Sequence, residues 1–456
     1  MKKVSIMVIL FMLVISGSSH FFIHAAPNES NENVTINIAL YKCDVTTNPY
    51  TIFCFRYAWH ENGKWYIFNI TEIGKEEVIK ALSNENFDVF IVGASAKSYL
   101  MDSFNERWRQ AVKKFVWNGG GYIGICGGAN LASMGYMQPK SPFQRYINRG
   151  VLGIASVYIN DDFDGEWQYL LKVNYDNYSG QIGVKTKIVE GDIFKDYDKK
   201  FLNISYGGGP SFYLNNDVKP LLIYDEEPMY TKPIHYWIPA PNGWKIWKNV
   251  TTDIKGQAAA IETNYGKGKI FLFGPHPEEY FMENGSIIEY FGKSAWGRWR
   301  YVYSYVGGQW TQLSQNWWIL RRAVAIAAGI NGLPPLSRLA AVISHPDEMI
   351  KGVYINNRAI DIPFLNKIAE IMGRDIIIGN FTTVVYTVDG TKAEFYIDGK
   401  LCNTTTEIKE FSIDNFRYKA FTWKLHCSNG FHTLKVIVYD KDGNYAWDER
   451  KLLVIA

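Results

Sequence analysis

Residues 121–133 read GYIGICGGANLAS, and this segment decides how the rest of the chain is interpreted. An apolar run, 121–125, leads directly into Cys126, and a stretch of small residues follows it. The pattern G-x-C-x-G is typical of a nucleophile elbow, a sharp turn from a strand into a helix that needs nearly bare flanking positions. Gly124, Gly127 and Gly128 meet that need. The segment therefore predicts a cysteine sulfur raised above a sheet at the start of a helix.

At the start of a helix, the helix field and the free amides favour a thiolate and can bind a developing oxyanion. We expect the Gly127 amide to be one such donor. The second is expected from the loop after the apolar run 87–92, which contains Ala94 and Ser95. Residues 119–124 also spell G-x-G-x-x-G, but these glycines precede a strand instead of following one, so a dinucleotide site is not supported.

A nucleophilic thiol needs a base, and His276 is the candidate. It follows the apolar run 269–273 in the sequence GPHPE. The carboxyl ends of parallel strands share one edge of a sheet, so His276 is expected on the same rim as Cys126. Glu278 can orient the imidazole and stabilise its charged form. Alone, His-Pro-Glu is more often a surface turn, but with the upstream elbow the catalytic interpretation is favoured.

Apolar runs alternate with helical spacing along the first part of the chain, which predicts a doubly wound, mostly parallel α/β sheet. The expected strands cover 34–41, 87–92, 121–125 and 269–273, and the expected helices cover 75–82, 105–117 and 317–330.

The breaker cluster that begins at residue 331 is the expected domain boundary. Beyond it, short alternating runs at 383–388, 393–397 and 433–439 are separated by Asp-Gly turns, a pattern typical of an antiparallel sandwich. We predict an α/β domain over 34–330, a linker over 331–335 and an all-β sandwich over 336–456.

The N-terminus predicts export. A basic start, an apolar run and small residues before Ala26 describe a signal peptide over 1–26, with an uncleaved anchor as the alternative. We therefore expect a secreted protein or one on the extracellular face of the membrane. The triplet N-x-Ser/Thr, a glycosylation signal in exported proteins, begins at Asn28, Asn33, Asn69, Asn177, Asn203, Asn249, Asn284, Asn380 and Asn403.

The chain has five cysteines. In an oxidising compartment, Cys43 with Cys54 and Cys402 with Cys427 are expected to form two local disulfides. Cys126 is then left over, as an inert buried residue or as a reactive thiol, and the elbow around it favours the reactive thiol. The formal net charge is only +3 and the basic residues are scattered, so no nucleic-acid partner is expected.

GICGG followed far downstream by GPHPE resembles the class I glutamine amidotransferase superfamily. The closer likeness is to the branch named after the N-terminal domain of biotin-protein ligase, carried by GICGGANLAS, by the loop of Tyr206, Gly207 and Gly208 that ends at Pro210, and by KGKIFLFGPHPE. This resemblance covers about 34–330. It implies a flavodoxin-like fold with Cys126 as nucleophile, His276 as base and Glu278 as its partner. The segment 336–456 resembles Ig-like modules of secreted proteins, which act as spacers or adhesive domains.

Glutamine-hydrolysing members of that superfamily usually carry Gln four residues after the nucleophile, where this chain has Asn130. No ammonia-accepting synthetase domain is expected in the chain. The leading hypothesis is thus a cysteine hydrolase that acts on an amide or related carbonyl through a thioester, with a small-molecule, peptide or glycan substrate that is unknown; a cysteine peptidase would differ only in substrate. The alternative is a non-catalytic surface binding protein that uses the same pocket.

Two further features of the sequence each allow two interpretations. The glycine run at 207–209 can lie against a ligand or form a plain tight turn. The aromatic stretch 296–318 can form a sugar platform, but core packing is favoured. Metal catalysis is the least favoured chemistry, because neither HExxH nor paired CxxC occurs. No metal or organic cofactor is expected.

Overall fold

The computed structural model describes residues 33–42, 49–94, 98–139, 142–160, 171–173, 182–215, 217–226, 234–250, 254–291, 301–347, 350–413 and 416–455. Residues Asn33–Ala456 form one compact unit. The predicted signal peptide lies outside the described residues, as do Asn28 and Asn177. In the part of the chain that the structure describes, no helix is long and apolar enough to cross a bilayer.

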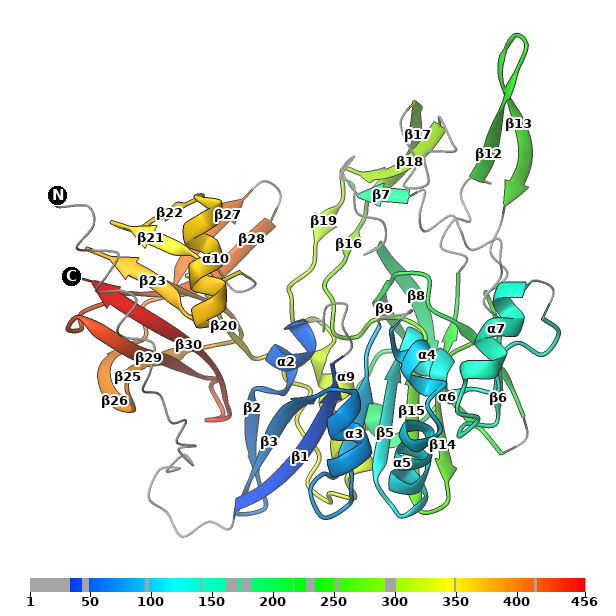
Figure 1. Cartoon of the computed structure of the whole chain (residues 1–456), viewed down its shortest axis with the longest axis horizontal. Helices are drawn as coiled ribbons and strands as arrows, with labels where there is room; N and C mark the ends of the chain where they lie inside the picture. The colour runs from blue at the N-terminus through cyan, green and yellow to red at the C-terminus, as the bar shows by residue number, and fades with distance from the viewer. Residues whose placement is uncertain are drawn as a thin grey trace. The chain divides into compact units, whose positions relative to one another are not determined.

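A parallel sheet forms the centre of the first part of the chain (Figure 1). Its strands are, side by side, β3 (Lys64–Ile73), β1 (Asn33–Tyr41), β4 (Val89–Val92), β5 (Gly121–Ile125) and β15 (Gly268–Phe273), each parallel to its neighbour. When these five strands are numbered by their position along the chain, their order across the sheet is 2-1-3-4-5. This is one of the common orders of doubly wound sheets, in which ligands bind beyond the carboxyl ends of the strands. The predicted mixed α/β architecture with a parallel sheet is confirmed.

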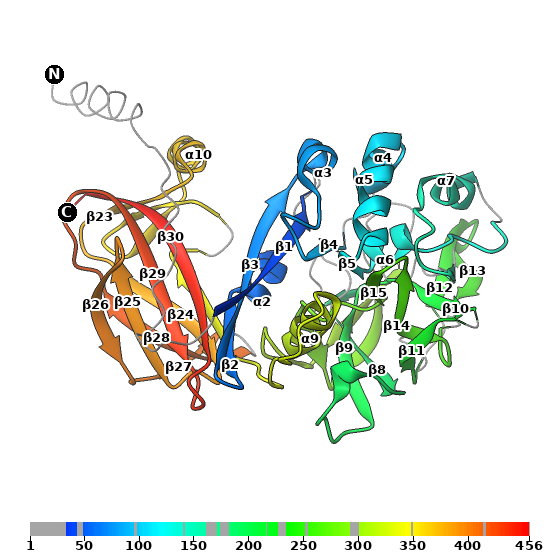
Figure 2. The same cartoon turned by 90° about the horizontal axis from the view of Figure 1, so that it is seen from below.

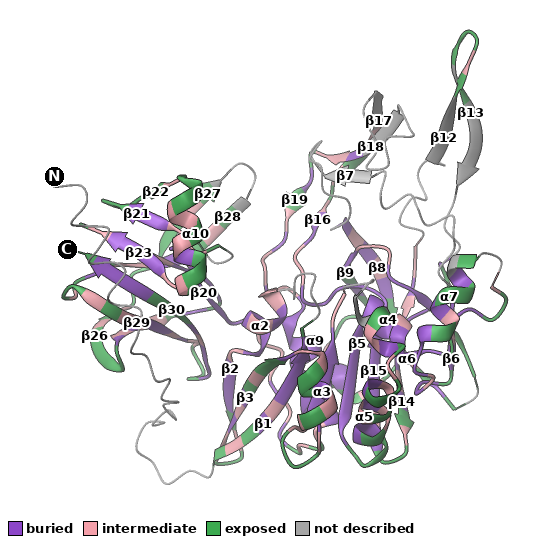
Figure 3. Cartoon of the chain, viewed as in Figure 1, coloured by how far each residue is buried: buried purple, intermediate pink, exposed green. Residues whose placement is uncertain are grey.

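Helices cover both faces of this sheet (Figure 2). Alternate residues of a strand point to opposite faces of the sheet. On one face, Ala39 packs in the layer that contains α3 (Lys75–Ala81) and α5 (Glu106–Trp117). On the other face, Ile38 packs in the layer that contains α2 (Pro49–Phe55) and α9 (Trp317–Ala327). Burial on both sides makes the central strands almost entirely apolar (Figure 3).

Antiparallel strands extend the sheet on both sides. β14 (Ala258–Tyr265) pairs with β15, and β2 (Tyr57–Glu61) pairs with β3. The other elements of this part are α4 (Ser98–Ser103), α6 (Gly127–Ala132), α7 (Pro142–Gly150), β6 (Val157–Asn160), β7 (Leu171–Val173), β8 (Ile182–Ile188), the 3-10 helix η2 (Asp192–Phe194), β9 (Phe201–Tyr206), β10 (Ser211–Leu214), β11 (Lys219–Tyr224), β12 (Ile234–Ala240), β13 (Gly243–Val250), β16 (Met282–Glu283), β17 (Ser286–Phe291), β18 (Tyr301–Val306) and β19 (Gln309–Trp310).

The C-terminal part contains two sheets. The first is antiparallel, in the order β20 (Ala340–His345), β24 (Thr382–Val388), β28 (Phe416–Lys424) and β27 (Lys409–Ile413). The second runs β26 (Lys400–Thr405), β25 (Lys392–Ile397), β29 (Gly430–Tyr439), β30 (Tyr445–Ile455), β23 (Asp375–Ile378), β21 (Val353–Ile355) and β22 (Arg358–Ile360).

The sequence pattern located the strands of this part but not all of its architecture. Asp389 and Asp398 adopt φ values of 57° and 50°, the left-handed conformation that aspartate tolerates in tight turns, as the Asp-Gly signals predicted. However, β23 is parallel to both β21 and β30, and α10 (Pro363–Met372) follows β22. Two parallel strand pairs and a helix depart from a purely antiparallel sandwich, and they were not predicted.

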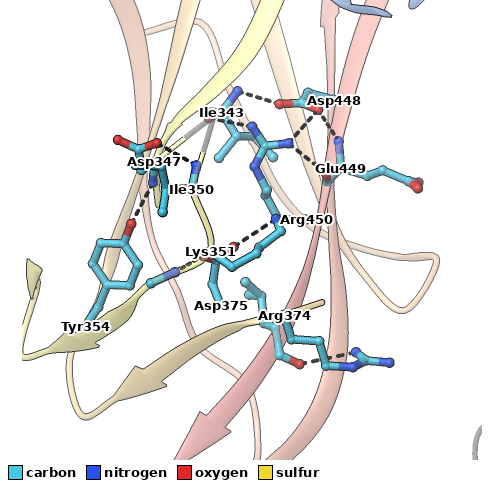
Figure 4. Close-up of polar contacts among 12 residues, drawn as sticks. Ile343, Asp347, Ile350, Lys351, Tyr354, Arg374, Asp375, Asp448, Glu449 and Arg450 are labelled. Carbon is cyan, nitrogen blue, oxygen red and sulfur yellow. Dashed lines mark hydrogen bonds and ion pairs between the residues drawn. The ribbon is translucent and has the colours of Figure 1, made fainter. Parts of the chain in front are cut away.

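The two parts of the chain share a continuous sheet, because β2 pairs with β30. Beside this pairing, the carboxylate of Asp448 binds Arg56 of the first part, the Ile343 amide at 2.8 Å and the Arg450 guanidinium at 3.1 Å. Figure 4 shows the last two contacts and, nearby, the ion pair between Lys351 and the buried Asp375. The carboxylate of Asp448 is fully buried, so its charge is balanced by these partners.

Neither predicted disulfide is formed among the cysteines that the structure describes. Cys54, Cys402 and Cys427 are free thiols, and Cys43 lies outside the described residues. Cys54 is buried against α9, where its sulfur donates to the Trp317 carbonyl at 3.6 Å, and burial raises the pKa of its thiol to about 12. Cys402 lies on β26 and Cys427 follows β28, which belongs to the other sheet. Nearness in sequence suggested both pairs, but Cys54 is enclosed by the core beside α9. Cys402 and Cys427 remain thiols, although burial raises the pKa of Cys427 and the charge of Cys402 reaches it and helps to raise it.

Candidate active site

The elbow at Cys126 has the strained backbone that such a turn requires. Cys126 has a φ of 50° and a ψ of −104°, which a non-glycine residue adopts only when its surroundings hold it there. Its amide donates to the Phe273 carbonyl of β15 at 2.7 Å. Its carbonyl accepts from the amides of Ala129 and Asn130, both at 3.0 Å, and so begins α6. The neighbouring strand β15 and the following helix α6 together fix the position of the half-buried sulfur.

Two glycines of the elbow are required by close backbone approach. A Cβ at Gly124 would lie 2.7 Å from the Gly128 carbonyl oxygen, and a Cβ at Gly128 would lie 1.9 Å from that of Val92. The Gly128 amide also donates to the Gly93 carbonyl at 3.1 Å. The elbow is thereby joined to the loop after β4, the loop that was predicted to supply the second oxyanion donor. In that loop Ala94 is half-buried, and Ser95 lies outside the described residues.

His276 and Glu278 lie on the segment that leaves the carboxyl end of β15. The His276 amide donates to the Ser205 carbonyl at 2.8 Å, which fixes the histidine against the end of β9. Its Nδ1 lies 3.0 Å from Oε1 of Glu278, and both side chains are buried. The Glu278 carboxylate therefore orients the imidazole and leaves Nε2 on the side away from it.

The imidazole of His276 interacts with the sulfur of Cys126. Burial lowers the pKa of His276, but the negative charges of Glu279, Cys126 and Glu278 and a hydrogen bond with Cys126 outweigh it. The net effect raises the pKa of His276 well above its usual value of 6.5. The structure thus brings the three predicted residues together as sulfur, imidazole and carboxylate.

The glycine loop after β9 closes against this group. A Cβ at Gly207 would lie 3.3 Å from Nε2 of His276, and a Cβ at Gly209 would lie 3.3 Å from the Cys126 sulfur. The Tyr206 hydroxyl donates to the Gly209 carbonyl at 3.2 Å, and Gly208 has a φ of 83°. The loop is therefore both a tight turn and a wall of the site, whose backbone leaves no room for a side chain beside the sulfur and the imidazole.

Gly209→Ala is expected to destabilise the fold by about 3 kcal/mol or more, since its Cβ would lie 1.8 Å from the Gly274 carbonyl oxygen and backbone cannot move aside cheaply. Urea unfolding of the variant measures this loss. Gly93→Ala is the control, because a Cβ there meets no atom within 4 Å. Equal stability of the two variants would show that the loop does not pack in this way.

The pKa of His276 also sets an expected pH dependence. A group whose pKa is raised by folding contributes stability that is complete below its unfolded pKa and is lost as the pH rises through the folded value. The difference in unfolding free energy between wild type and His276→Gln should therefore shrink as the pH increases above 6.5. Urea titrations over a pH series test this, and a difference that stays constant or grows would contradict it.

A layer of buried residues behind the site was not found by sequence reasoning. The indole nitrogen of Trp317 donates to the Glu278 carbonyl at 2.9 Å, and the Trp317 side chain is fully buried. On the same helix, Arg321 donates to the carbonyls of Cys54 at 2.8 Å and Leu339 at 2.9 Å. The signal that could have found them is an apolar helix interrupted by two arginines, which must find buried partners.

The remaining candidates are placed as follows. Asn130 lies on α6 and is half-buried. Of the aromatic stretch 296–318, Trp317 and Trp318 are core residues, Trp310 is half-buried, and residues 296–300 lie outside the described residues. Within the described residues, the ligand atoms of His276, Glu278 and Glu279 lie within 4.8 Å of one another, close enough to share a cation. In the structure the Glu278 carboxylate instead contacts the imidazole of His276. This arrangement suits proton transfer by the imidazole rather than binding of a metal ion.

The fold and the site together define an α/β protein with a cysteine elbow that faces a histidine–glutamate pair. No protein-family model and no curated protein matches the sequence. Among solved structures, the chain is similar to a GMP synthase subunit from Thermoplasma acidophilum (11% identity, 64% of this chain and 94% of that chain, TM-score 0.31). It is also similar to a glutamine amidotransferase from Thermotoga maritima (13% identity, 53% and 76%, TM-score 0.29) and to a ThuA-like protein from Bacteroides uniformis (12%, 55% and 86%, TM-score 0.29). At these TM-scores the likenesses add nothing to what the geometry says.

Proposed function

We propose that the protein is a cysteine hydrolase that acts on an amide or a related carbonyl compound. The sulfur of Cys126 attacks the carbonyl carbon, and the C–N bond breaks as His276 gives its proton to the leaving amine. Water, deprotonated by His276, then attacks the resulting thioester, which releases the acid and restores the thiol. Glu278 keeps the imidazole oriented through both steps.

One observation carries this proposal: the imidazole of His276 interacts with the Cys126 sulfur and with the Glu278 carboxylate at the same time. A buried imidazole held between a carboxylate and a sulfur has the base-plus-orienter arrangement of cysteine hydrolases. The Gly127 amide at the start of α6 and the loop around Ala94 are the proposed oxyanion donors. The backbone wall of Gly207 and Gly208 is the proposed substrate contact.

We further propose that the hydrolase is exported and glycosylated. The sequon residues Asn33, Asn69, Asn203, Asn284 and Asn380 are exposed and Asn403 is half-buried, which suits attachment of a glycan. For Asn249 only the strand is described. Expression in a glycosylating host, followed by mass determination before and after glycosidase treatment, tests this part separately from catalysis.

The test of the hydrolase is a screen of the purified protein against amide and ester libraries beside Cys126→Ala. We expect turnover of at least one class, and its loss in the variant. Mass spectrometry of the quenched reaction should show an acyl group on Cys126. Glu278→Gln keeps the shape of the side chain and removes its charge, so it should retain the acyl adduct but form it more slowly. Turnover that survives in Cys126→Ala would overturn the proposal, and binding without turnover would favour a non-catalytic surface protein.

A further inference from the structure

Two buried tyrosines lie behind the glycine loop 207–210, which forms a wall of the candidate active site. Tyr206 is the last residue of β9 and Tyr224 is the last residue of β11, and β8 pairs with both of these strands. Tyr206 lies opposite Ile182 of β8, and Tyr224 lies opposite Thr186, four positions further along. Positions four apart on a strand share a face, and so do residues directly opposite each other. The two tyrosines therefore point to the same side of the sheet.

The two rings meet on that side. Their centroids are 5.7 Å apart and their planes are at 82°, the edge-to-face contact that aromatic pairs favour. Both side chains are buried. The Tyr224 amide donates to the Gln257 carbonyl at 3.0 Å, and the Tyr224 carbonyl accepts from the Gly256 amide at 2.8 Å. Packing and backbone bonds together leave the two rings little freedom to move.

Each hydroxyl binds a carbonyl of the glycine loop. The Tyr206 hydroxyl donates to the Gly209 carbonyl and the Tyr224 hydroxyl donates to the Pro210 carbonyl, both at 3.2 Å. Burial raises the pKa of Tyr224 well above its usual value of 10, and the charges of Tyr206 and Cys126 raise it further, so this hydroxyl keeps its proton and can donate. Both bonds are buried, and the loss of either donor would therefore be costly. The loop is tied to the tyrosines at two consecutive residues.

The same short loop borders the sulfur and the imidazole. A Cβ at Gly209 would lie 3.3 Å from the Cys126 sulfur, and a Cβ at Gly207 would lie 3.3 Å from Nε2 of His276. Cys126 is itself half-buried. The position of the loop therefore sets how much room remains around the sulfur.

We propose that Tyr206 and Tyr224 are positioning residues whose hydroxyls keep the glycine loop against the site and so limit the size of the group that can reach the Cys126 sulfur. A substrate with a small group beside the scissile carbonyl passes this wall, and one with a bulky group there is excluded. Without the hydroxyls, the loop keeps its ends in β9 and β10 but can move away from the sulfur. The consequence for substrates rests on the proposed function, whereas the limit on size applies to any reagent that reaches the thiol.

Alkylation of Cys126 in the full chain by two reagents of different size tests the proposal. Iodoacetamide and its N-naphthyl derivative share one reactive group, so the ratio of their rates (bulky reagent over small reagent) measures room rather than reactivity. In the wild type this ratio should be roughly tenfold lower at Cys126 than at the exposed Cys402. Tyr224→Phe and Tyr206→Phe remove only a hydroxyl, and each should raise the ratio at Cys126 by roughly fivefold, the scale of one lost hydrogen bond.

Tyr386→Phe is the matched control, because Tyr386 is a buried tyrosine of the C-terminal part whose hydroxyl donates to Gln312 at 2.9 Å. Urea unfolding measures the stability that each variant loses. The ratio at Cys126 should stay at the wild-type value in Tyr386→Phe, whatever stability is lost, since a purely structural effect would change the ratio in step with stability.

Three results would overturn the proposal: equal ratios at Cys126 and Cys402 in the wild type, an unchanged ratio in both Tyr206→Phe and Tyr224→Phe, or an equal rise in Tyr386→Phe. The proposed hydrolase fails in a different way. If Cys126 reacts slowly with both reagents but the ratios change as expected, the hydrolase loses its reactive thiol, and the limit on size is supported.

Discussion

Replacing His276 with alanine is expected to slow the alkylation of Cys126 by iodoacetamide at neutral pH by roughly tenfold or more. The reactive species is the thiolate, and an unassisted cysteine is only a few per cent thiolate at pH 7. In the structure, charge and hydrogen bonding between the two groups help to raise the pKa of His276 well above its usual range. The imidazole is also the group placed to accept the proton of the thiol as it reacts, so its removal takes that assistance away.

Peptide mass mapping measures the alkylation rate of each cysteine in one sample. Cys402 is exposed and serves as the internal reference, because its labelling should not respond to the change at His276. His345→Ala is the matched control, since His345 stacks on Phe381 in the C-terminal part. If Cys126 reacts no faster than Cys402 in the wild type, or at the same rate in His276→Ala, the interaction has no chemical consequence and the enzyme proposal loses its basis.

Arg321→Met is expected to destabilise the protein by about 3–5 kcal/mol. The Arg321 side chain is fully buried and donates to three carbonyls, those of Cys54, Ser337 at 3.2 Å and Leu339. Its guanidinium carbon also lies 3.9 Å from the centre of the Tyr57 ring. Methionine keeps most of the volume but none of the donors, so all three carbonyls would stay buried without this partner.

Urea unfolding followed by fluorescence measures the change. Arg358→Met is the control, because Arg358 is exposed on β22 and its loss should alter stability by less than about 0.5 kcal/mol. Arg321→Lys keeps the charge but offers a single nitrogen, so it should recover only part of the loss. A cost below about 1 kcal/mol for Arg321→Met would show that water satisfies these carbonyls and that the residue does not join α9 to the segment before β20.

Sequence reasoning succeeded where the signal is local. The run 121–125 and the glycines around Cys126 predicted a strand and an elbow, because backbone approach as close as that between Gly128 and Val92 excludes every larger residue. The expected strand 269–273 matches β15 to within one residue. His276 could be placed on the same rim as Cys126 because parallel strands align their carboxyl ends.

Sequence reasoning failed where partners are distant. The contact between Trp317 and Glu278 joins residues 39 positions apart, and that between Arg321 and Cys54 joins residues 267 positions apart. The same holds for the pairing of β2 with β30. No periodicity or turn signal specifies such contacts, since each depends on where whole elements come to pack.

The sequence by itself determined the elbow, the alternation of strands and helices, and the residues that can act as nucleophile, base and orienter. Those features depend on steric limits and hydrogen bonding within a few residues, which a short motif states completely. Only the tertiary structure decided that the loop 206–210 closes beside both the sulfur and the imidazole and that α9 contacts the Glu278 backbone through Trp317. It also decided that the cysteines outside the elbow stay unpaired in the part of the chain that the structure describes. Many residues of the sequence are chemically equivalent as partners for a given side chain. Which of them meet is decided only when distant elements pack together and bury their contacts.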